Sequence, residues 1–271
     1  MMQNEGRLSI IRRQRLPVIE QYLLRAASLR STTVPLVSVV TSTRKVHLPS
    51  SIQPLIAAVA RWSYCEPDVL PPDVGFVEPL LRRRLSSLAK MSLGVAYSCA
   101  HDVPDLRIVY ASRHGELART TMMLESLASG EDLSPTQFSM SVLNASAGLF
   151  SILRKNTAPA TAISAGCASF GYGLLEACLQ QLENPGQSVL YVYADEPVPE
   201  VYGTTGLPGS NAHAVGLLLT PKAEKRIACA IAAHDDGASD EAQSRAFLRC
   251  LDAGQATWSE AGKRWSWMLC S

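Results

Sequence analysis

One cysteine stands where the local pattern favours a reactive thiol. The segment Ala160–Leu182 begins with a short apolar run typical of a strand, turns sharply at Gly166 and continues as an amphipathic helix, with Cys167 at its first turn. The unpaired backbone N–H groups and the positive end of the helix dipole should lower the pKa of this thiol and favour the thiolate. The pattern predicts that Cys167 occupies a nucleophile position, in a tight bend between a central strand and a buried helix. Cysteine is also a small side chain that buries readily, so a packing role at the bend is equally well supported.

Groups that would assist such a nucleophile are not evident in the sequence. Of the histidines downstream, His213 and His234 lack the setting of a catalytic base, and we expect His213 to be a satisfied or edge histidine at the start of a buried strand. His114 lies two residues before Glu116 in a strand-to-helix turn, and such a pair could do acid–base work. The favoured interpretation is structural, with Glu116 complementing the dipole of the helix that follows.

Other polar positions have plain structural readings. Asp195 and Glu196 follow a buried strand, and a turn and cap is favoured over an acid–base pair. Arg82–Arg84 could dock an acidic partner, but a solvated helix face is the more ordinary explanation for a charge run beside an apolar stripe. Serine hydrolase chemistry is unsupported, because no serine has a GxSxG context.

Composition limits the remaining function classes. The chain has 271 residues, 47% of them hydrophobic, and a net charge of +1, which suits a globular domain and argues against nucleic-acid binding through overall positive potential. The seven cysteines are widely spaced and form no CxxC pair, so a reduced, cytoplasmic compartment fits best. No ligand cluster or phosphate-binding glycine loop is present, so we expect no metal and no nucleotide cofactor.

The N-terminal segment differs in composition from the rest of the chain. Residues 1–46 hold eight basic and two acidic side chains with a Ser/Thr-rich patch, which predicts a flexible N-terminal extension, and no signal peptide is evident. Residues 47–271 are expected to form one domain. No apolar run reaches the roughly 18–20 residues needed to span a bilayer.

Strand-like and helix-like segments alternate along this domain. Strands are expected at 106–111, 160–164, 188–194, 213–220, 226–233 and 265–269, with a strand or short helix at 52–62. Helices are expected at 79–100, 116–128, 141–153, 167–182 and 240–252. Alternation of this kind indicates an α/β fold, a mixed sheet flanked by helices.

The order of these elements, together with specific sequence segments, resembles the β-ketoacyl synthase family. The resemblance spans about residues 47–269. The segments that carry it are Leu80–Ser98, Tyr110–Ile152, Thr161–Ala177, Val189–Pro197 and Trp265–Trp267. It is a resemblance to the N-terminal half of these enzymes, and within them to the compact chain length factors of aryl polyene pathways. It implies a thiolase-like half-fold.

The resemblance also implies a function and partners. Chain length factors pair with a full-length β-ketoacyl-ACP synthase, which performs the condensation on substrates carried by acyl carrier protein. The resemblance makes Cys167 the nucleophile-equivalent position, where this branch usually has a non-nucleophilic residue. It makes Phe138, Asn144 and Phe170 candidates to line the acyl tunnel, although Phe138 could equally be a core aromatic and Asn144 a turn amide.

The resemblance therefore implies a ketosynthase-like chain length factor that is non-condensing or weakly active, because the two histidines that the family's C-terminal repeat contributes are missing. The alternative is a stand-alone acyltransferase of the same fold that uses Cys167 as its acyl-accepting nucleophile. A purely structural homodimer is a third reading.

Overall fold

One eight-stranded sheet organises the domain. The computed structural model describes residues 54–203, 211–234 and 237–270. The strands are β1 (Leu55–Cys65), β2 (Arg107–Ala111), β3 (Ala160–Ile163), β4 (Val189–Asp195), β5 (His213–Leu219), β6 (Lys225–Ala233), β7 (Gln255–Glu260) and β8 (Lys263–Leu269). They lie in the order β3-β2-β4-β5-β1-β6-β8-β7. Strand β2 runs parallel to β3 and β4, and the other neighbours pair antiparallel. The predicted mixed sheet is confirmed.

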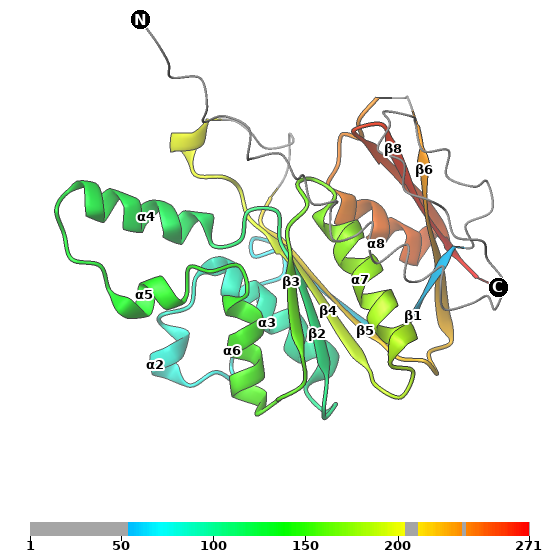
Figure 1. Ribbon diagram of the computed structural model, residues 1–271, viewed down its shortest axis with the longest axis horizontal. Coiled ribbons are helices and arrows are strands. Elements are labelled where there is room, and N and C mark those ends of the chain that lie inside the picture. The colour runs from blue at the N-terminus through cyan, green and yellow to red at the C-terminus, as the bar shows by residue number, and fades with distance from the viewer. Residues whose placement is uncertain (1–53, 204–210, 235–236, 271) are drawn as a thin grey trace, which may run out of the picture. The chain divides into compact units, whose positions relative to one another are not determined.

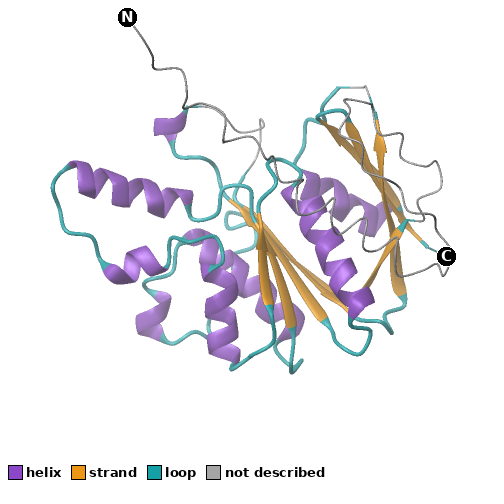
Figure 2. Ribbon diagram, in the orientation of Figure 1, coloured by secondary structure: helices purple, strands orange, loops and turns teal. Residues whose placement is uncertain are grey.

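Helices cover both faces of the sheet (Figures 1 and 2). They are α2 (Pro79–Arg82), α3 (Ser87–Ala100), α4 (Leu117–Ala128), α5 (Pro135–Ser139), α6 (Ala145–Arg154), α7 (Ser169–Glu183) and α8 (Gln243–Ala253), with a 3-10 turn at Glu200–Tyr202. Helices α7 and α8 pack on one face, and α3 and α6 pack on the other. The result is a helix–sheet–helix sandwich.

The side-chain alternation of the strands builds two cores. In β4, Tyr191 and Tyr193 join the α7–α8 core, while Leu190 and Val192 join the α3–α6 core. Because successive residues of a strand point to opposite faces, a strand buried on both sides is a continuous apolar run. This explains why the segments that form β4 and β5 are almost entirely apolar.

The predicted helix at 79–100 is two helices. The chain leaves the helical conformation after α2, and Ser86, in an extended conformation, accepts a hydrogen bond from the backbone N–H of Ala89 at 2.9 Å. A serine cap of this kind starts a new helix by satisfying one of its free donors. The apolar spacing continues across the break, so periodicity alone did not reveal it.

Two further expectations need correction. Strand β3, expected to be central, is an edge strand with only β2 beside it. Strand β7 was not predicted at all; it forms an antiparallel hairpin with β8 through Ala261 and Gly262, which both have positive φ. The hairpin buries Trp258, Trp265 and Trp267. The expected boundary between an extension at 1–46 and a domain at 47–271 lies outside the described residues.

None of the helices that the structure describes is long and apolar enough to cross a membrane.

Candidate functional site

The bend that carries Cys167 is held by one serine. Gly166 has φ +60°, a backbone conformation that L side chains rarely adopt. Ser169 Oγ accepts a hydrogen bond from the N–H of Ala165 at 2.8 Å and donates to the carbonyl of Gly166 at 2.7 Å. Ser169 is fully buried. The bend between β3 and α7 is therefore as tight as the sequence predicts, and its shape is fixed by local hydrogen bonds.

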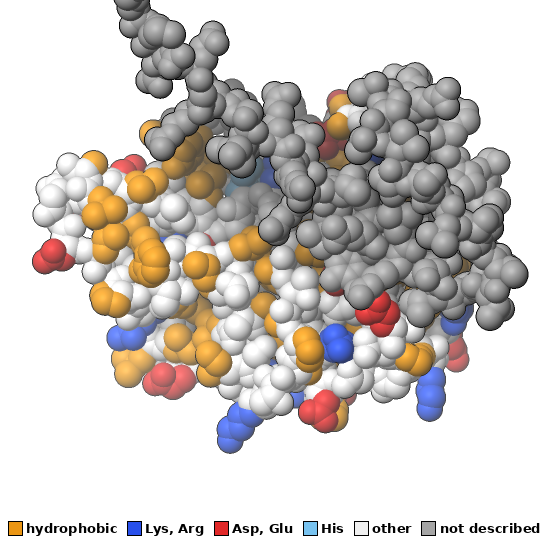
Figure 3. Space-filling view, viewed as in Figure 1, with side chains coloured by type: hydrophobic (Ala, Val, Ile, Leu, Met, Phe, Trp, Pro, Cys, Tyr) orange, Lys and Arg blue, Asp and Glu red, His pale blue; other side chains and the backbone are white. Residues whose placement is uncertain are grey.

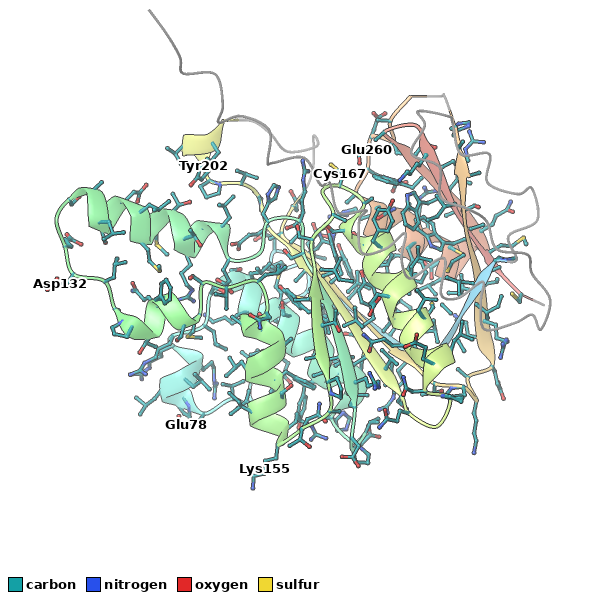
Figure 4. The ribbon with its side chains drawn as sticks, viewed as in Figure 1. Glu78, Asp132, Lys155, Cys167, Tyr202 and Glu260 are labelled. Carbon is teal, nitrogen blue, oxygen red and sulfur yellow. The ribbon has the colours of Figure 1, made fainter. Side chains whose placement is uncertain are left out.

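The electrostatic prediction for Cys167 is wrong. Helix α7 begins at Ser169, so the thiol precedes the helix rather than lying in its first turn. Its pKa is raised to about 11, first by burial and then by a hydrogen bond to the Glu260 carboxylate, while Arg113 lowers it. Glu260 ends β7 and lies beside Cys167 (Figure 4). Desolvation and a nearby anion both disfavour the thiolate.

A small cavity lies next to the thiol. Its volume is about 30 Å³, which is room for about two water molecules. Its walls come from five parts of the chain: the turn after β2, the bend at Cys167, the end of β4 with the residues that follow, the start of β5 and the start of α8. The lining residues include Arg113, His114, Cys167, Asp195, His213 and Gln243.

Two carboxyl groups in this cavity have raised pKa values. Burial raises the pKa of Asp195 to about 6, although Ser112 Oγ donates to it at 3.3 Å and the N–H of His114 at 3.4 Å. Burial, followed by the charges of Glu116 and Asp195, raises the pKa of Glu196 to about 7. Both groups therefore change protonation near neutral pH, which a plain turn and cap would not require.

Burial disfavours the charged form of the two histidines of the cavity. Burial lowers the pKa of both His114 and His213. His213 Nδ1 lies 2.9 Å from the carbonyl oxygen of Asn211, and Nε2 lies 2.6 Å from Ser244 Oγ. A carbonyl only accepts, so Nδ1 carries the proton and Nε2 accepts from the serine. His213 is thus satisfied, as expected, but it also lines the cavity that holds Cys167.

Comparison with known proteins identifies the fold family. The model of the family described as beta-ketoacyl synthase, N-terminal domain, matches residues 58–268. The chain belongs to the β-ketoacyl synthase N-terminal domain family. No curated protein matches the sequence.

Solved structures of β-ketoacyl synthase-like proteins agree with this. A chain in the structure of the ketosynthase ApeO in complex with its chain length factor ApeC, from Xenorhabdus doucetiae, is 28% identical with a TM-score of 0.66, and the match covers 79% of this chain and 99% of that one. The ishigamide ketosynthase/chain length factor is 14% identical with a TM-score of 0.52, covering 73% of both chains, which shows the fold alone. The thiolase-like fold expected from the sequence is confirmed.

The other candidate residues of this β-ketoacyl synthase-like domain have different surroundings. Phe170 is fully buried in the α7–α8 core, in contact with Tyr191, Tyr193, Phe247 and Trp267. Phe138 on α5 is 60% exposed, and Asn144 precedes α6 at the surface without a side-chain cap bond. None of the three lines the cavity. Their tunnel-lining role stays a prediction.

Arg82 has a local structural task. Its guanidinium donates to the carbonyl oxygen of Val77 at 2.8 Å from Nη2 and at 3.2 Å from Nε. Arg83 and Arg84 are exposed. The charge run is therefore only partly a solvated face.

Two residues that matter at the site escaped the sequence reasoning. Glu260 and Gln243 lie far along the chain from Cys167 and reach it through the β7–β8 hairpin and helix α8. The Glu-Ala-Gly turn between two tryptophan-bearing runs was a usable hairpin signal. No pattern in the sequence around Gln243 indicated that this residue would line the site. Within 54–203, 211–234 and 237–270, no group of three His, Cys, Asp or Glu side chains could hold a metal ion.

Proposed function

We propose that this chain is a chain length factor, a ketosynthase-like subunit that pairs with a full-length β-ketoacyl-ACP synthase in polyene or fatty-acid-like chain assembly. The partner supplies the condensing chemistry and receives its substrates from acyl carrier protein. Support comes from membership of the β-ketoacyl synthase N-terminal domain family and from similarity to a structure that holds a ketosynthase with its chain length factor.

The lengths of the matched chains favour the compact subunit. The match with the Xenorhabdus structure uses 99% of that chain but only 79% of this one, so the matched chain is shorter than this one and is aligned over its whole length. A two-lobed condensing enzyme would leave a large unmatched part. The match over nearly the whole of a shorter chain supports the proposal that this domain resembles a one-lobed subunit.

The match to a structure that holds a ketosynthase with its chain length factor carries the proposal, and the surroundings of Cys167 agree with it. Burial and the Glu260 carboxylate raise the pKa of Cys167 to about 11, which disfavours the thiolate at neutral pH. His213, the buried imidazole of the cavity, is bound to Ser244 and to a backbone carbonyl. A condensing step needs a thiolate and groups that stabilise developing negative charge. A cavity with a protonated thiol and two carboxyl groups is poorly suited to that chemistry.

The surface offers room for a protein partner. Several exposed apolar side chains lie on α4 and α5, and the space-filling view shows apolar groups on this side of the molecule (Figure 3). They include Met122, Leu124, Leu127 and Phe138. Apolar patches of this kind on a folded protein commonly mark interfaces. A heterodimer with the ketosynthase would cover this surface.

The proposal also places the protein in the cytoplasm. All seven cysteines, including the exposed Cys270, are free thiols. Thiols persist in a reducing compartment, which is also where acyl carrier proteins work with their synthases.

Co-expression with a full-length ketosynthase tests the proposal. The expected result is a stable complex with one copy of each chain, which survives size-exclusion chromatography and is seen by native mass spectrometry. A homodimer that excludes the ketosynthase would contradict it and favour a purely structural assembly.

The alternative, a stand-alone acyltransferase that uses Cys167, predicts a different result. The purified chain incubated with acyl carrier protein thioesters would gain the mass of the acyl group, and the gain would be absent in Cys167→Ala. The raised pKa of the thiol argues against this outcome.

A further inference from the structure

Three carboxyl groups meet where the end of β4 lies beside the start of α4. Glu116 precedes α4 and is 4% exposed. Asp195 ends β4, Glu196 follows it, and both are half-buried residues that line the cavity beside Cys167. The charges of Glu116 and Asp195 both act on Glu196. Like charges that are partly shielded from water repel more strongly than exposed ones, so ionising all three groups weakens the packing of this region.

An arginine next to these groups is bound to Glu116. Arg119 Nε donates to Glu116 Oε2 at 3.2 Å, and Arg119 Nη2 donates to the carbonyl oxygen of Arg84 at 3.1 Å. Ser86 Oγ donates to Glu116 Oε1 at 2.7 Å. Ionised carboxylates accept hydrogen bonds of this kind. Glu116 therefore places a well-anchored negative charge beside Glu196.

The hydrogen bonds that join the end of β4 to the turn after β2 and to α4 are long. Ser112 Oγ donates to Asp195 Oδ1 at 3.3 Å, and the N–H of His114 donates to the same oxygen at 3.4 Å. Farther along the chain, the hydroxyl oxygens of Tyr202 and Thr121 lie 3.3 Å apart. Hydrogen bonds of this length are weak. They offset little of a repulsion between the carboxyl groups.

We propose that the junction formed by residues 112–121 and 195–202 is a pH-dependent contact that opens locally when Glu196 loses its proton. With the proton in place, Glu196 adds no negative charge beside Glu116, and the junction is closed. Without it, repulsion favours separation of the two segments, which both contribute walls of the cavity. The proposal concerns regulation and goes beyond the chain length factor function, which requires no response to pH. Its test uses the full chain without a partner, so the outcome does not depend on complex formation.

The direction of the pH effect follows from the groups that hold protons in the closed junction. Burial, followed by the charges of Glu116 and Asp195, raises the pKa of Glu196 from 4.5 to about 7. Burial raises the pKa of Asp195 from 3.8 to about 6. Opening exposes both carboxyl groups to water and returns their pKa values toward the ordinary range, so the closed form binds protons more tightly. The stability that these protons give the closed junction is fully present below about pH 4 and is lost as pH rises through 6 and 7.

The other charged or titratable groups near Glu196 come from several elements. Arg119 faces it from α4 and opposes the rise in its pKa. The cavity walls add Arg113, His114, Cys167, Tyr193 and His213. Burial lowers the pKa of both histidines, so charging them below about pH 6.5 disfavours the closed form, against the effect of Glu196. A comparison between two chains that both keep these histidines cancels their contribution.

Hydrogen–deuterium exchange of the full chain measures the opening. Peptides that cover the two segments are labelled at about pH 6 and about pH 8, with labelling times scaled to the intrinsic exchange rate at each pH. Between these pH values, the raised pKa of Glu196 increases the opening equilibrium about tenfold. Glu196→Gln has the shape of the protonated side chain and should lose this increase. Glu200→Gln is the matched control, because Glu200 lies on the same segment but is exposed.

The expected result is an increase that is confined to the junction and lost in Glu196→Gln but kept in Glu200→Gln. Three results would overturn the proposal: the same increase in the unaltered chain and in Glu196→Gln, the same loss in Glu200→Gln, or an increase of equal size in peptides from α8 and β8. The second would point to a general charge effect, and the third to unfolding of the whole domain.

Discussion

At the residue scale, the Cys167 thiol with the Glu260 carboxylate beside it, and the two carboxyl groups that line the cavity, decide the chemistry of the site. Glu260 accepts a hydrogen bond from Cys167, and Asp195 and Glu196 hold protons up to near-neutral pH. The position of Cys167 could be predicted from the sequence because the bend is encoded locally by Gly166 and the helix that follows. Its pKa could not, because Glu260 comes from a hairpin more than 90 residues later, and long-range contacts leave no mark in local spacing.

Glu260→Gln is predicted to lower the pKa of Cys167 by about one unit, since it removes the anion that most favours the protonated thiol. The rate of iodoacetamide reaction at Cys167, followed against pH by peptide mass spectrometry, measures this. Glu241→Gln is the control, because this carboxylate is paired with Arg249 on the surface. An unchanged profile in Glu260→Gln would show that burial alone sets the pKa.

Asp195→Asn is predicted to change how stability depends on pH. The pKa of this carboxyl is raised from 3.8 to about 6. Between these values the folded protein keeps a proton that the unfolded chain releases, so the stability that Asp195 contributes is lost as pH rises from about 4 to above 6.

Asparagine removes this dependence and keeps an acceptor for Ser112. The variant should gain about 3 kcal/mol relative to the unaltered protein between pH 4 and pH 8, measured by urea unfolding at each pH. The exposed Asp102→Asn should show no such gain, since the pKa of Asp102 is lowered by its hydrogen bond to Arg61. A gain of the same size there would point to a general charge effect.

At the element scale, the bend before α7 positions Cys167 at the cavity, and the β7–β8 hairpin positions Glu260 beside it. The strands and helices with strong periodic patterns were predicted nearly to their observed ends. The failures have physical causes: the serine cap at Ser86 interrupts a continuous apolar stripe, and β7 mixes polar residues with Ala256 and Trp258. The cavity residue Gln243 depends on how α8 packs on α7, which no local pattern specifies.

The bend can be tested with two glycines that differ in backbone conformation. Gly166 and Gly148 both have open space where a Cβ would be added, but only Gly166 has a positive φ. Gly166→Ala should lower the free energy of unfolding by about 1–2 kcal/mol. Gly148→Ala, within α6, should raise it by about 0.5–1 kcal/mol. Equal effects of the two changes in chemical denaturation would mean that the backbone at Gly166 is not strained by a side chain.

At the scale of the whole molecule, two cores pack on opposite faces of one sheet, and apolar side chains are exposed on α4 and α5. Phe170 lies in the α7–α8 core, whereas Phe138 is one of the exposed apolar side chains on α5. The resemblance made both residues candidates to line the acyl tunnel, because it matches positions along the sequence and carries no information on what surrounds each side chain.

Alanine substitutions separate the two phenylalanines. Phe170→Ala should cost about 3–5 kcal/mol, because the ring fills the centre of the α7–α8 core. Phe138→Ala should change the stability of the chain by less than about 0.5 kcal/mol, as expected for an exposed side chain. Thermal and urea unfolding measure both. A small loss for Phe170→Ala would indicate that its ring faces removable space, as a tunnel-lining residue would.

The central claim is that this protein takes part in condensation although the growing acyl chain is not attached to the sulfur of its Cys167. The most direct measurement is intact mass spectrometry of the ketosynthase complex, quenched during turnover with acyl carrier protein thioesters. The account predicts that the acyl mass appears on the ketosynthase subunit and that the mass of this chain is unchanged. An acyl increment on this chain, mapped to Cys167 and absent in Cys167→Ala, would contradict it.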